Sequence, residues 1–557
     1  MRRSTRSADR AVRSPTSTWA RVRTERRRAL DIGAAAAVLA ALIGASGCSV
    51  RVDVVAIDAT RAVAPAADPG VTAPALENAT PDDSTPVFEE TSLAVAELLV
   101  DIPIADVIDI GDGKPPQPHD GFAAVALADV ERWWTEVFPS LYGVDFEPLA
   151  GGVFAGYPGR SPDIPGCGTS TTPYADLQLY VAFYCQFGDF MAYDDGDGPD
   201  SLLTPLADEF GPAVIGVVLA HEFGHAVQSR IGALDEPIAT IFTEQQADCF
   251  AGAWTGQAYR GESPFVRLGD RDIRAGLLAM LSVRDPVGTD QFVLGGHGSA
   301  FDRVGAFQEG FLGGAERCAT LLDQPLDLMP NRFQTGIDAF FEGNAPYDCT
   351  ELDPDIVGQD FIDACTPAPV FLADDLDDFW RTRLGDGFQP VGVVAERRLD
   401  DIVCPDLVRL DRSVAVCPGD RTVHYDEPNV IALYREVGDF GLGYLYGIAW
   451  AELALQELGS TATGEPRALL ADCFTGAWVR DITPDRNGVT PRQGDRDGDG
   501  TDDSVVSSPG DLDEAIRMTI LIGDERADSD VVGAPFEKIE AFRVGVLGGL
   551  DACAALA

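Results

Sequence analysis

The stretch PAVIGVVLAHEFGHAVQ, residues 212–228, decides the fold of the chain around it. Its residues are apolar on nearly every side of a helical projection, which predicts one long helix buried in the protein. Two of the five histidines of the chain, His221 and His225, stand four residues apart in this segment. Residues at positions i and i+4 share one face of a helix. We therefore expect both imidazoles to point at the same place, with Glu222 beside it.

Two imidazoles on one helical face provide half of the ligands that a tetrahedral zinc ion needs. The segment TEQQADCFAGAW, residues 243–254, is predicted to form a second helix with Glu244 and Asp248 on one face. We expect Glu244 to be the third zinc ligand and Asp248 to accept a hydrogen bond from a ligand histidine. Glu222 is then the general base that takes a proton from zinc-bound water. Two structural interpretations stay open: a pair of hydrogen-bonded core histidines, and a solvated acidic face for the two carboxylates.

Two parts of the chain are related in sequence. Residues 206–232 align without a gap with residues 433–459, and ADCFAGAW at 247–254 recurs as ADCFTGAW at 471–478. Further matching blocks before and after these segments keep the same order. A repeat with a period of about 230 residues indicates a duplicated domain rather than a solenoid.

The second copy lacks the polar set of the first. The residues that face one another in the alignment are His221 and Ile448, Glu222 and Ala449, His225 and Glu452, Glu244 and Ala468, and His297 and Val532. Core residues are similar in the two copies, whereas all five of these polar residues differ. A joint loss of this kind is typical of residues that serve one function. Asp248 differs from them because its counterpart, Asp472, is kept. This indicates that Asp248 also has a structural role.

The first copy resembles a known protein family. HEFGH at 221–225, EQQADCFAGAW at 244–254 and GGHGSAFDRVGAFQEGF at 295–311 are similar to motifs of the bacterial neutral zinc metallopeptidase family. Members of that family are membrane-associated proteins of the gluzincin type. The resemblance covers the first copy, and the second copy resembles the family only as a degenerate relative.

The resemblance implies a zincin-like domain with zinc held by His221, His225 and Glu244. It also implies that Glu222 is the general base. By analogy with related gluzincins, His297 is expected to stabilise the oxyanion of the tetrahedral intermediate. The alternative for His297 is a purely structural histidine.

These observations together predict an extracytoplasmic zinc-dependent endopeptidase that hydrolyses peptide bonds, with Zn²⁺ as cofactor and a protein or peptide as substrate. The alternative is a non-enzymatic envelope protein that binds only a metal or a partner. Glu222 favours the enzyme, because a binding site needs ligands but no base. A third possibility is that the second copy gates the first.

The first 48 residues are typical of an export signal. Arg-rich RVRTERRR precedes the apolar run IGAAAAVLAALIGASG at 32–47, which is short for a membrane-spanning helix. The run ends at Cys48, as at a bacterial lipoprotein processing site where that cysteine is lipidated. We therefore expect a lipoprotein anchored at the extracytoplasmic face of the cell membrane. An uncleaved anchor and a secreted protein are the alternatives.

The predicted fold class is α+β and mainly helical, with short strands near 150–195 and 388–425. The predicted parts are an export segment, a flexible acidic tether rich in Ala and Pro, an intact copy, a connecting segment and a degenerate copy, at 1–48, 49–121, 122–345, 346–370 and 371–557. The formal net charge is −49 over 557 residues. Such a surface repels nucleic acid, so we expect no nucleic-acid partner.

Ten cysteines remain if Cys48 is lipidated, an even number in an exported chain. The correspondence between the copies predicts four disulfides: Cys167–Cys185, Cys404–Cys417, Cys249–Cys318 and Cys473–Cys553. Cys349 and Cys365 lie together in the segment between the copies, and we expect them to form a fifth.

The second copy contains an insertion, DRDGDGTDD at 495–503, that predicts a calcium loop. Its candidate ligands are Asp495, Asp497, Asp499 and Asp503. The twelfth position of the loop is Val506 instead of the usual glutamate, so the predicted Ca²⁺ site is incomplete. The alternative is an acidic surface loop.

Overall fold

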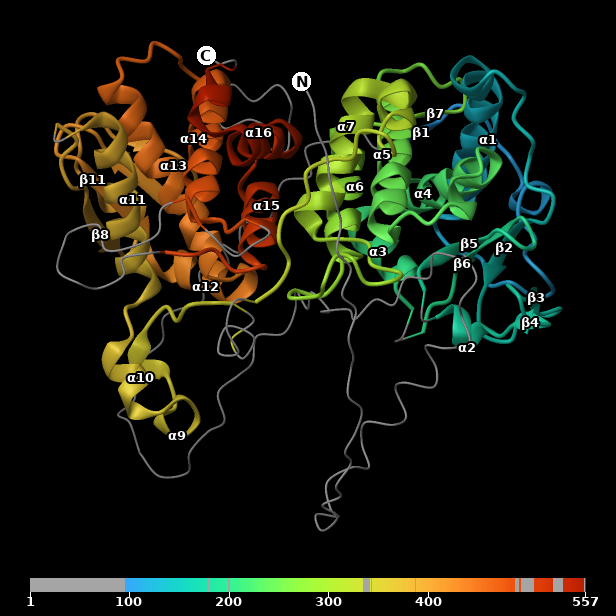
Figure 1. The fold of residues 1–557 in the computed structure, drawn as a ribbon, viewed down its shortest axis with the longest axis horizontal. Helices are drawn as coiled ribbons and strands as arrows, with labels where there is room; N and C mark the ends of the chain where they lie inside the picture. The colour runs from blue at the N-terminus through green and yellow to red at the C-terminus, as the bar shows by residue number, and fades with distance from the viewer. Residues whose placement is uncertain are drawn as a thin grey trace, which may run out of the picture. The chain divides into compact units, whose positions relative to one another are not determined.

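The computed structural model describes residues 96–178, 180–198, 201–333, 341, 343–385, 387–485, 490–491, 505–523, 534–554 and 556. The export segment, Cys48, most of the tether and the candidate calcium loop lie outside the described residues. The described residues form an α+β structure that is mainly helical (Figure 1). Among them, no helix is both long and apolar enough to cross a membrane.

The N-terminal part of the structure runs from residue 96 to residue 333. Its helices are α1 (Asp120–Tyr142), α2 (Tyr174–Leu177), α3 (Leu203–Phe210), α4 (Ala213–Arg230), α5 (Thr240–Tyr259), α6 (Asp270–Ser282) and α7 (Ala300–Ala319), with the 3-10 turns η1 (Ile104–Asp106) and η2 (Ala233–Asp235). Its strands are β1 (Glu97–Leu98), β2 (Gly152–Gly156), β3 (Ile164–Pro165), β4 (Thr171–Thr172), β5 (Ala182–Cys185), β6 (Phe190–Asp194) and β7 (Val266–Arg267).

The C-terminal part follows from residue 343. Its helices are α9 (Pro354–Val357), α10 (Gln359–Ala364), α11 (Ala368–Leu384), α12 (Glu427–Val437), α13 (Asp439–Glu457), α14 (Glu465–Ile482), α15 (Asp511–Ile522) and α16 (Pro535–Cys553), with η3 (Cys349–Glu351) and η4 (Leu399–Asp401). Its strands are β8 (Gly392–Glu396), β9 (Val408–Arg409), β10 (Val414–Cys417) and β11 (Thr422–Asp426).

Helix α4 is the centre of the N-terminal part and is buried from Ala213 to Gln228, as its apolar sequence predicts. Helices α1, α5 and α6 contact it. The glycine of the HEFGH stretch permits one of these contacts. A Cβ added to Gly224 would lie 3.0 Å from the Cα of Ala247 on α5, a tight contact that the glycine avoids where the two helices approach each other. This approach brings the side chains of α5 next to those of α4.

Two small sheets contain most of the strands, within the regions where strands were predicted. The sheet of the N-terminal part has the order β2-β6-β5, with β2 parallel to β6 and β5 antiparallel to it. The sheet of the C-terminal part has the order β8-β11-β10-β9, again with one parallel pair, β8 and β11.

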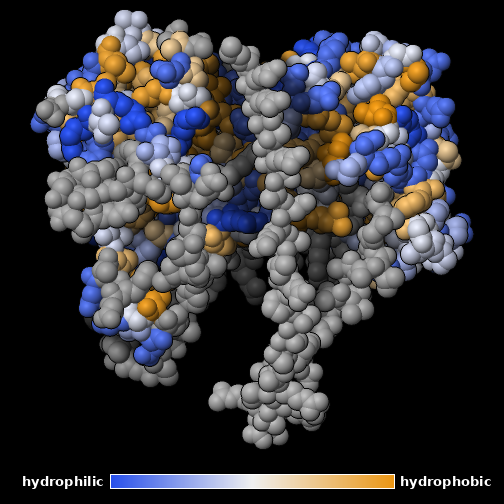
Figure 2. Space-filling view, in the orientation of Figure 1, coloured by the Kyte–Doolittle hydropathy of each residue, from blue (hydrophilic) through white to orange (hydrophobic). Residues whose placement is uncertain are grey.

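Hydrophilic residues alternate with hydrophobic patches on the face shown in Figure 2.

The segment from residue 96 to residue 119, which the sequence places in the tether, contacts the N-terminal part. Strand β1 pairs with β7, and the backbone N–H of Leu99 donates to the carbonyl of Phe265 at 2.8 Å. Ile108 is buried, and Asp109 forms a bridge with Phe154 of β2. Ile108 is therefore part of the core, and Val100 and Ile104 pack against it, whereas Leu98 and Leu99 are exposed.

Five disulfides join ten cysteines in the pairs that the sequence predicts: Cys167–Cys185, Cys249–Cys318, Cys349–Cys365, Cys404–Cys417 and Cys473–Cys553. Disulfides of this number are typical of proteins in an oxidising, extracytoplasmic compartment.

Polar contacts join α6 and α7 to α15 and α16. Arg284 Nε lies 2.8 Å from Asp513 Oδ2, and the N–H of Phe301 donates to Asp513 Oδ1 at 3.0 Å. Arg543 Nη1 donates to the carbonyl of Phe301 at 2.6 Å, and its guanidinium lies over the Phe301 ring. Because most of these groups are buried, each contact satisfies a group that is costly to leave unpaired.

Candidate metal centre

Helices α4 and α5 bring three predicted ligands together. The donor atoms of His221, His225 and Glu244 lie within 4.8 Å of one another, and all three side chains are buried. His221 Nε2 is 3.2 Å from Glu244 Oε2, and His225 Nε2 is 3.6 Å from Glu244 Oε1. The i, i+4 spacing on α4 places both imidazoles on the side that faces α5.

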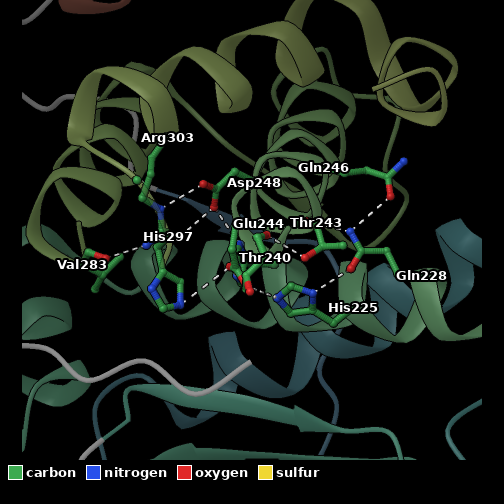
Figure 3. Close-up of polar contacts among 12 residues, drawn as sticks. His225, Gln228, Thr240, Thr243, Glu244, Gln246, Asp248, Val283, His297 and Arg303 are labelled. Atoms are coloured by element: carbon green, nitrogen blue, oxygen red, sulfur yellow. Dashed lines mark hydrogen bonds and ion pairs between the residues drawn. The ribbon is translucent and has the colours of Figure 1, made fainter. Parts of the chain in front are cut away.

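The other ring nitrogen of each histidine has its own partner. His221 Nδ1 lies 2.7 Å from Asp248 Oδ1, where the sequence places a hydrogen-bond acceptor for a ligand histidine. His225 Nδ1 lies 2.9 Å from Gln228 Oε1 (Figure 3). Partners of this kind fix the orientation and the tautomer of a metal-binding imidazole. Both rings are thus held with Nε2 toward Glu244.

Asp248 is also one half of a buried ion pair. Arg303 on α7 donates from Nε and Nη2 to its two oxygens at 2.9 and 2.8 Å, and from Nη1 to the carbonyl of Val283 (Figure 3). Burial alone raises the pKa of Asp248, but Arg303 and His221 outweigh this effect and hold the pKa below its usual range. The carboxylate therefore joins α7 to the metal centre as well as orienting His221.

Gln228 belongs to a chain of amides that the sequence analysis missed. Its Nε2 donates to the carbonyl of Thr243 at 2.7 Å and to Gln246 Oε1 at 3.1 Å. Gln246 Nε2 donates in turn to the carbonyl of Cys318 at 3.0 Å. The only signal in the sequence was the position of Gln228, three residues after His225 on the same helix.

His297 also lies at this centre, although it comes from the loop before α7. Its Nε2 is 3.8 Å from Glu244 Oε2, and its Nδ1 is 3.3 Å from Asp285 Oδ1. Asp285 Oδ2 accepts hydrogen bonds from the backbone N–H groups of His297 and Gly298, both at 2.8 Å. Asp285 therefore holds both the loop and the ring, and no sequence motif pointed to it.

Glu222 is buried next to His221 and His225 on α4, with 3% of its surface exposed. Its Oε2 has no hydrogen-bond partner among the described residues. Burial raises the pKa of Glu222, and the neighbouring His221 and His225 partly offset this effect. A buried carboxylate with a raised pKa and a free oxygen is suited to accepting a proton.

The charges of the centre favour a cation. Burial alone lowers the pKa of His221, but Asp248 and Glu244 outweigh it and raise the pKa to about 10. Burial raises the pKa of Glu244, but His297 and His225 hold it well below its usual range. Neither oxygen of Glu244 receives a hydrogen bond of ordinary geometry, although the side chain is fully buried. Two imidazoles and one carboxylate are a common donor set for zinc, so these residues fit that ion.

Two of the aligned positions of the C-terminal part hold acidic residues that form ion pairs. Glu452, the counterpart of His225, accepts hydrogen bonds from Arg467 Nε and Nη2 at 2.8 and 2.7 Å. Asp472, the counterpart of Asp248, accepts from Lys538 Nζ at 3.0 and 2.8 Å and from the hydroxyl of Tyr444.

Comparison with known proteins finds few relatives. No protein-family model matches the chain, and no solved structure gives a significant match. Curated proteins described as uncharacterized, from Mycobacterium tuberculosis and Mycobacterium bovis, are 34% identical to the chain over 134 residues. The match covers 22% of this chain and 43% of each relative, so the chain spans less than half the length of these relatives. They carry no activity over to this protein.

Proposed function

We propose that the protein is an extracytoplasmic zinc-dependent endopeptidase. The observation that carries the proposal is the convergence of His221, His225 and Glu244 in one buried place with Glu222 beside them. A site that only bound a metal would need the three ligands, but it would not need a buried glutamate next to them.

Zinc held by the three ligands would supply Lewis acidity toward a peptide carbonyl and lower the pKa of a water molecule. Glu222 accepts the proton of the attacking water and delivers it to the leaving nitrogen. His297 donates a hydrogen bond from Nε2 to the oxygen on which negative charge develops. Asp285 keeps the His297 ring in place through its contact with Nδ1.

An apolar rim beside His297 supports a peptide substrate. Phe292, Val293 and Leu294 are exposed on the same loop, and the ring of Phe292 lies edge-on to that of Phe242 at the start of α5. Clustered exposed apolar side chains next to a polar centre are typical of a binding surface. In the proposal, this rim contacts apolar side chains of the substrate.

We further propose that the chain is a duplicated zincin-like domain whose second copy has lost the site. A buried tryptophan–aspartate hydrogen bond supports the duplication, because Trp254 Nε1 donates to Asp129 at 2.9 Å and Trp478 Nε1 donates to Asp375 at 2.7 Å. The sheet order and the disulfide between the last long helix and an earlier one also recur. The Glu452–Arg467 ion pair stands where a metal ligand would be needed, so metal binding in the second copy is not expected.

The test is peptide-library hydrolysis by the purified protein and by the Glu222→Gln variant, with bound zinc measured in both. The expected result is that the variant retains zinc and loses hydrolysis. Full activity in the Glu222→Gln variant would overturn the assignment of the base. A wild-type protein that binds zinc but cleaves no peptide would favour a non-enzymatic metal-binding protein.

A further inference from the structure

A second buried polar cluster lies in the C-terminal part, where the zinc ligands are absent. Asp439, Asp511 and Glu514 have carboxylate oxygens within 4.8 Å of one another, and all three residues are buried. Asp439 begins α13, whereas Asp511 and Glu514 lie in the first turn of α15. A cavity of about 300 Å³ adjoins them, and both Asp439 and Asp511 line it.

Hydrogen bonds from backbone N–H groups account for only part of this cluster. The N–H of Ala345 donates to Asp439 Oδ2 at 2.9 Å, and the N–H of Phe440 donates to Glu514 Oε2 at 2.8 Å. The N–H of Ser508 donates to Asp511 Oδ2 at 2.9 Å. Asp439 Oδ1 has no hydrogen-bond partner among the described residues, although Asp439 is only 5% exposed. A buried carboxylate oxygen without a partner, on a side chain that lines a cavity, indicates a missing ligand.

A comparable cluster in the N-terminal part shows how such charges are neutralised. His119, Asp120 and Asp195 are equally close to one another, but Lys114 Nζ lies 2.6 Å from Asp120 and 2.7 Å from Asp195. Within the described part of the chain, no lysine or arginine forms an ion pair with Asp439 or Glu514. The lysine that serves the first cluster therefore has no described equivalent for these two residues.

Three carboxylates in one buried place repel one another. Burial raises the pKa of Asp439 to about 7. Burial, with the charges of Asp439 and Asp511, raises the pKa of Glu514 well above its usual range. The N-termini of α13 and α15 offset about half a charge each, so part of the negative charge of these groups remains when they are ionised. A divalent cation would balance that charge.

The cluster is specific to the C-terminal part. In the alignment of 206–232 with 433–459, Asp439 faces Pro212. Both α6 and α15 begin with Gly-Asp-x-Asp, and in this register Asp511 faces Asp270 and Glu514 faces Ile273. The N-terminal part thus has one acid at the three positions, and the duplicated architecture does not require the other two.

We propose that Asp439, Asp511 and Glu514 bind a divalent cation that prefers oxygen ligands, and that this cation is calcium. Calcium takes six to eight oxygen ligands in variable geometry, so carboxylates and water in the adjoining cavity suit it. Magnesium requires a stricter octahedral arrangement. The bound cation would join the N-terminal ends of α13 and α15 and thereby stabilise the C-terminal part. The inference is independent of the proposed peptidase activity.

The experiment measures thermal unfolding and calorimetric binding of the full chain, stripped of metals and reloaded with zinc, with calcium chloride added. At a calcium concentration 100 times Kd, the unfolding temperature of the wild type should rise by about 3–7 °C. Asp439→Asn and Glu514→Gln should lose this rise and the binding heat. Without calcium they should unfold at the wild-type temperature or above it, because they remove repulsion. Asp270→Asn, at the start of α6, is the matched control and should keep the calcium response.

Three results would overturn the proposal. The first is a wild-type protein that responds to neither calcium nor magnesium. The second is a calcium response that Glu514→Gln retains in full. The third is a response that Asp497→Asn abolishes while Asp439→Asn leaves it intact, since this would place the calcium in the loop at 495–503. A response to magnesium without one to calcium would overturn the choice of calcium.

Discussion

Replacing Asp248 by asparagine tests the link between the two roles of this carboxylate. The side chain is fully buried, lies 2.7 Å from His221 Nδ1 and accepts two hydrogen bonds from Arg303. Asp248→Asn keeps the shape of the side chain and removes its charge. The guanidinium of Arg303 then loses its ion-pair partner in the core, and His221 loses a charged acceptor.

The expected magnitudes follow from these contacts. Breaking a buried ion pair by removing one partner costs about 3–5 kcal/mol of the free energy of unfolding. Loss of a carboxylate that orients a metal-binding histidine lowers metal affinity by about 10–100-fold. Asp248→Asn should therefore lower both stability and zinc affinity.

The matched control is Asp472→Asn. Asp472 forms the corresponding buried ion pair with Lys538, but it contacts no candidate zinc ligand among the described residues. Its substitution should lower stability by a similar amount and leave zinc affinity unchanged. The assay combines urea unfolding with zinc competition against a chromophoric chelator. Equal zinc affinity in the wild type and in Asp248→Asn, or an equal loss in both variants, would refute the reasoning.

Two further predictions concern the surroundings of His297. Burial raises the pKa of Asp302 to about 7, whereas it is about 3.9 in the unfolded chain. The folded state therefore favours the protonated carboxyl. The contribution of this group to the free energy of unfolding is complete below pH 4 and is lost as the pH rises to 7. Asp302→Asn should therefore raise the unfolding temperature at pH 8 and flatten its dependence on pH between 4 and 7; an unchanged slope would contradict the assignment. Asp513 pairs with Arg284, the residue before Asp285, and accepts a hydrogen bond from the N–H of Phe301, four residues after His297. Asp513→Ala should therefore lower kcat without lowering zinc content. Wild-type kcat in a folded Asp513→Ala variant would show that these contacts do not position His297.

Local periodicity made much of the molecule predictable. The apolar pattern around HEFGH predicted α4 and its burial, and the i, i+4 spacings of His221 with His225 and of Glu244 with Asp248 predicted which side chains share a face. Four of the disulfides were predictable because the two related segments supply each other's register, and Cys349–Cys365 because the two cysteines are close in sequence. These features depend on residues that are close in sequence or that recur in a second copy.

The sequence by itself determined the mainly helical α+β class, the helices that became α4 and α5, the regions of the two main sheets, the five cysteine pairs and the faces on which the candidate ligands lie. Only the tertiary structure decided that α5 lies against α4 at Gly224, and that Arg303 pairs with Asp248 and Asp285 with His297. It alone brought Asp439 beside Glu514, 75 residues apart in the sequence. The physical reason is that a hydrogen-bonded turn or a helical face is set by neighbours within four residues. The partner of a buried charge is chosen among all the groups that folding removes from water.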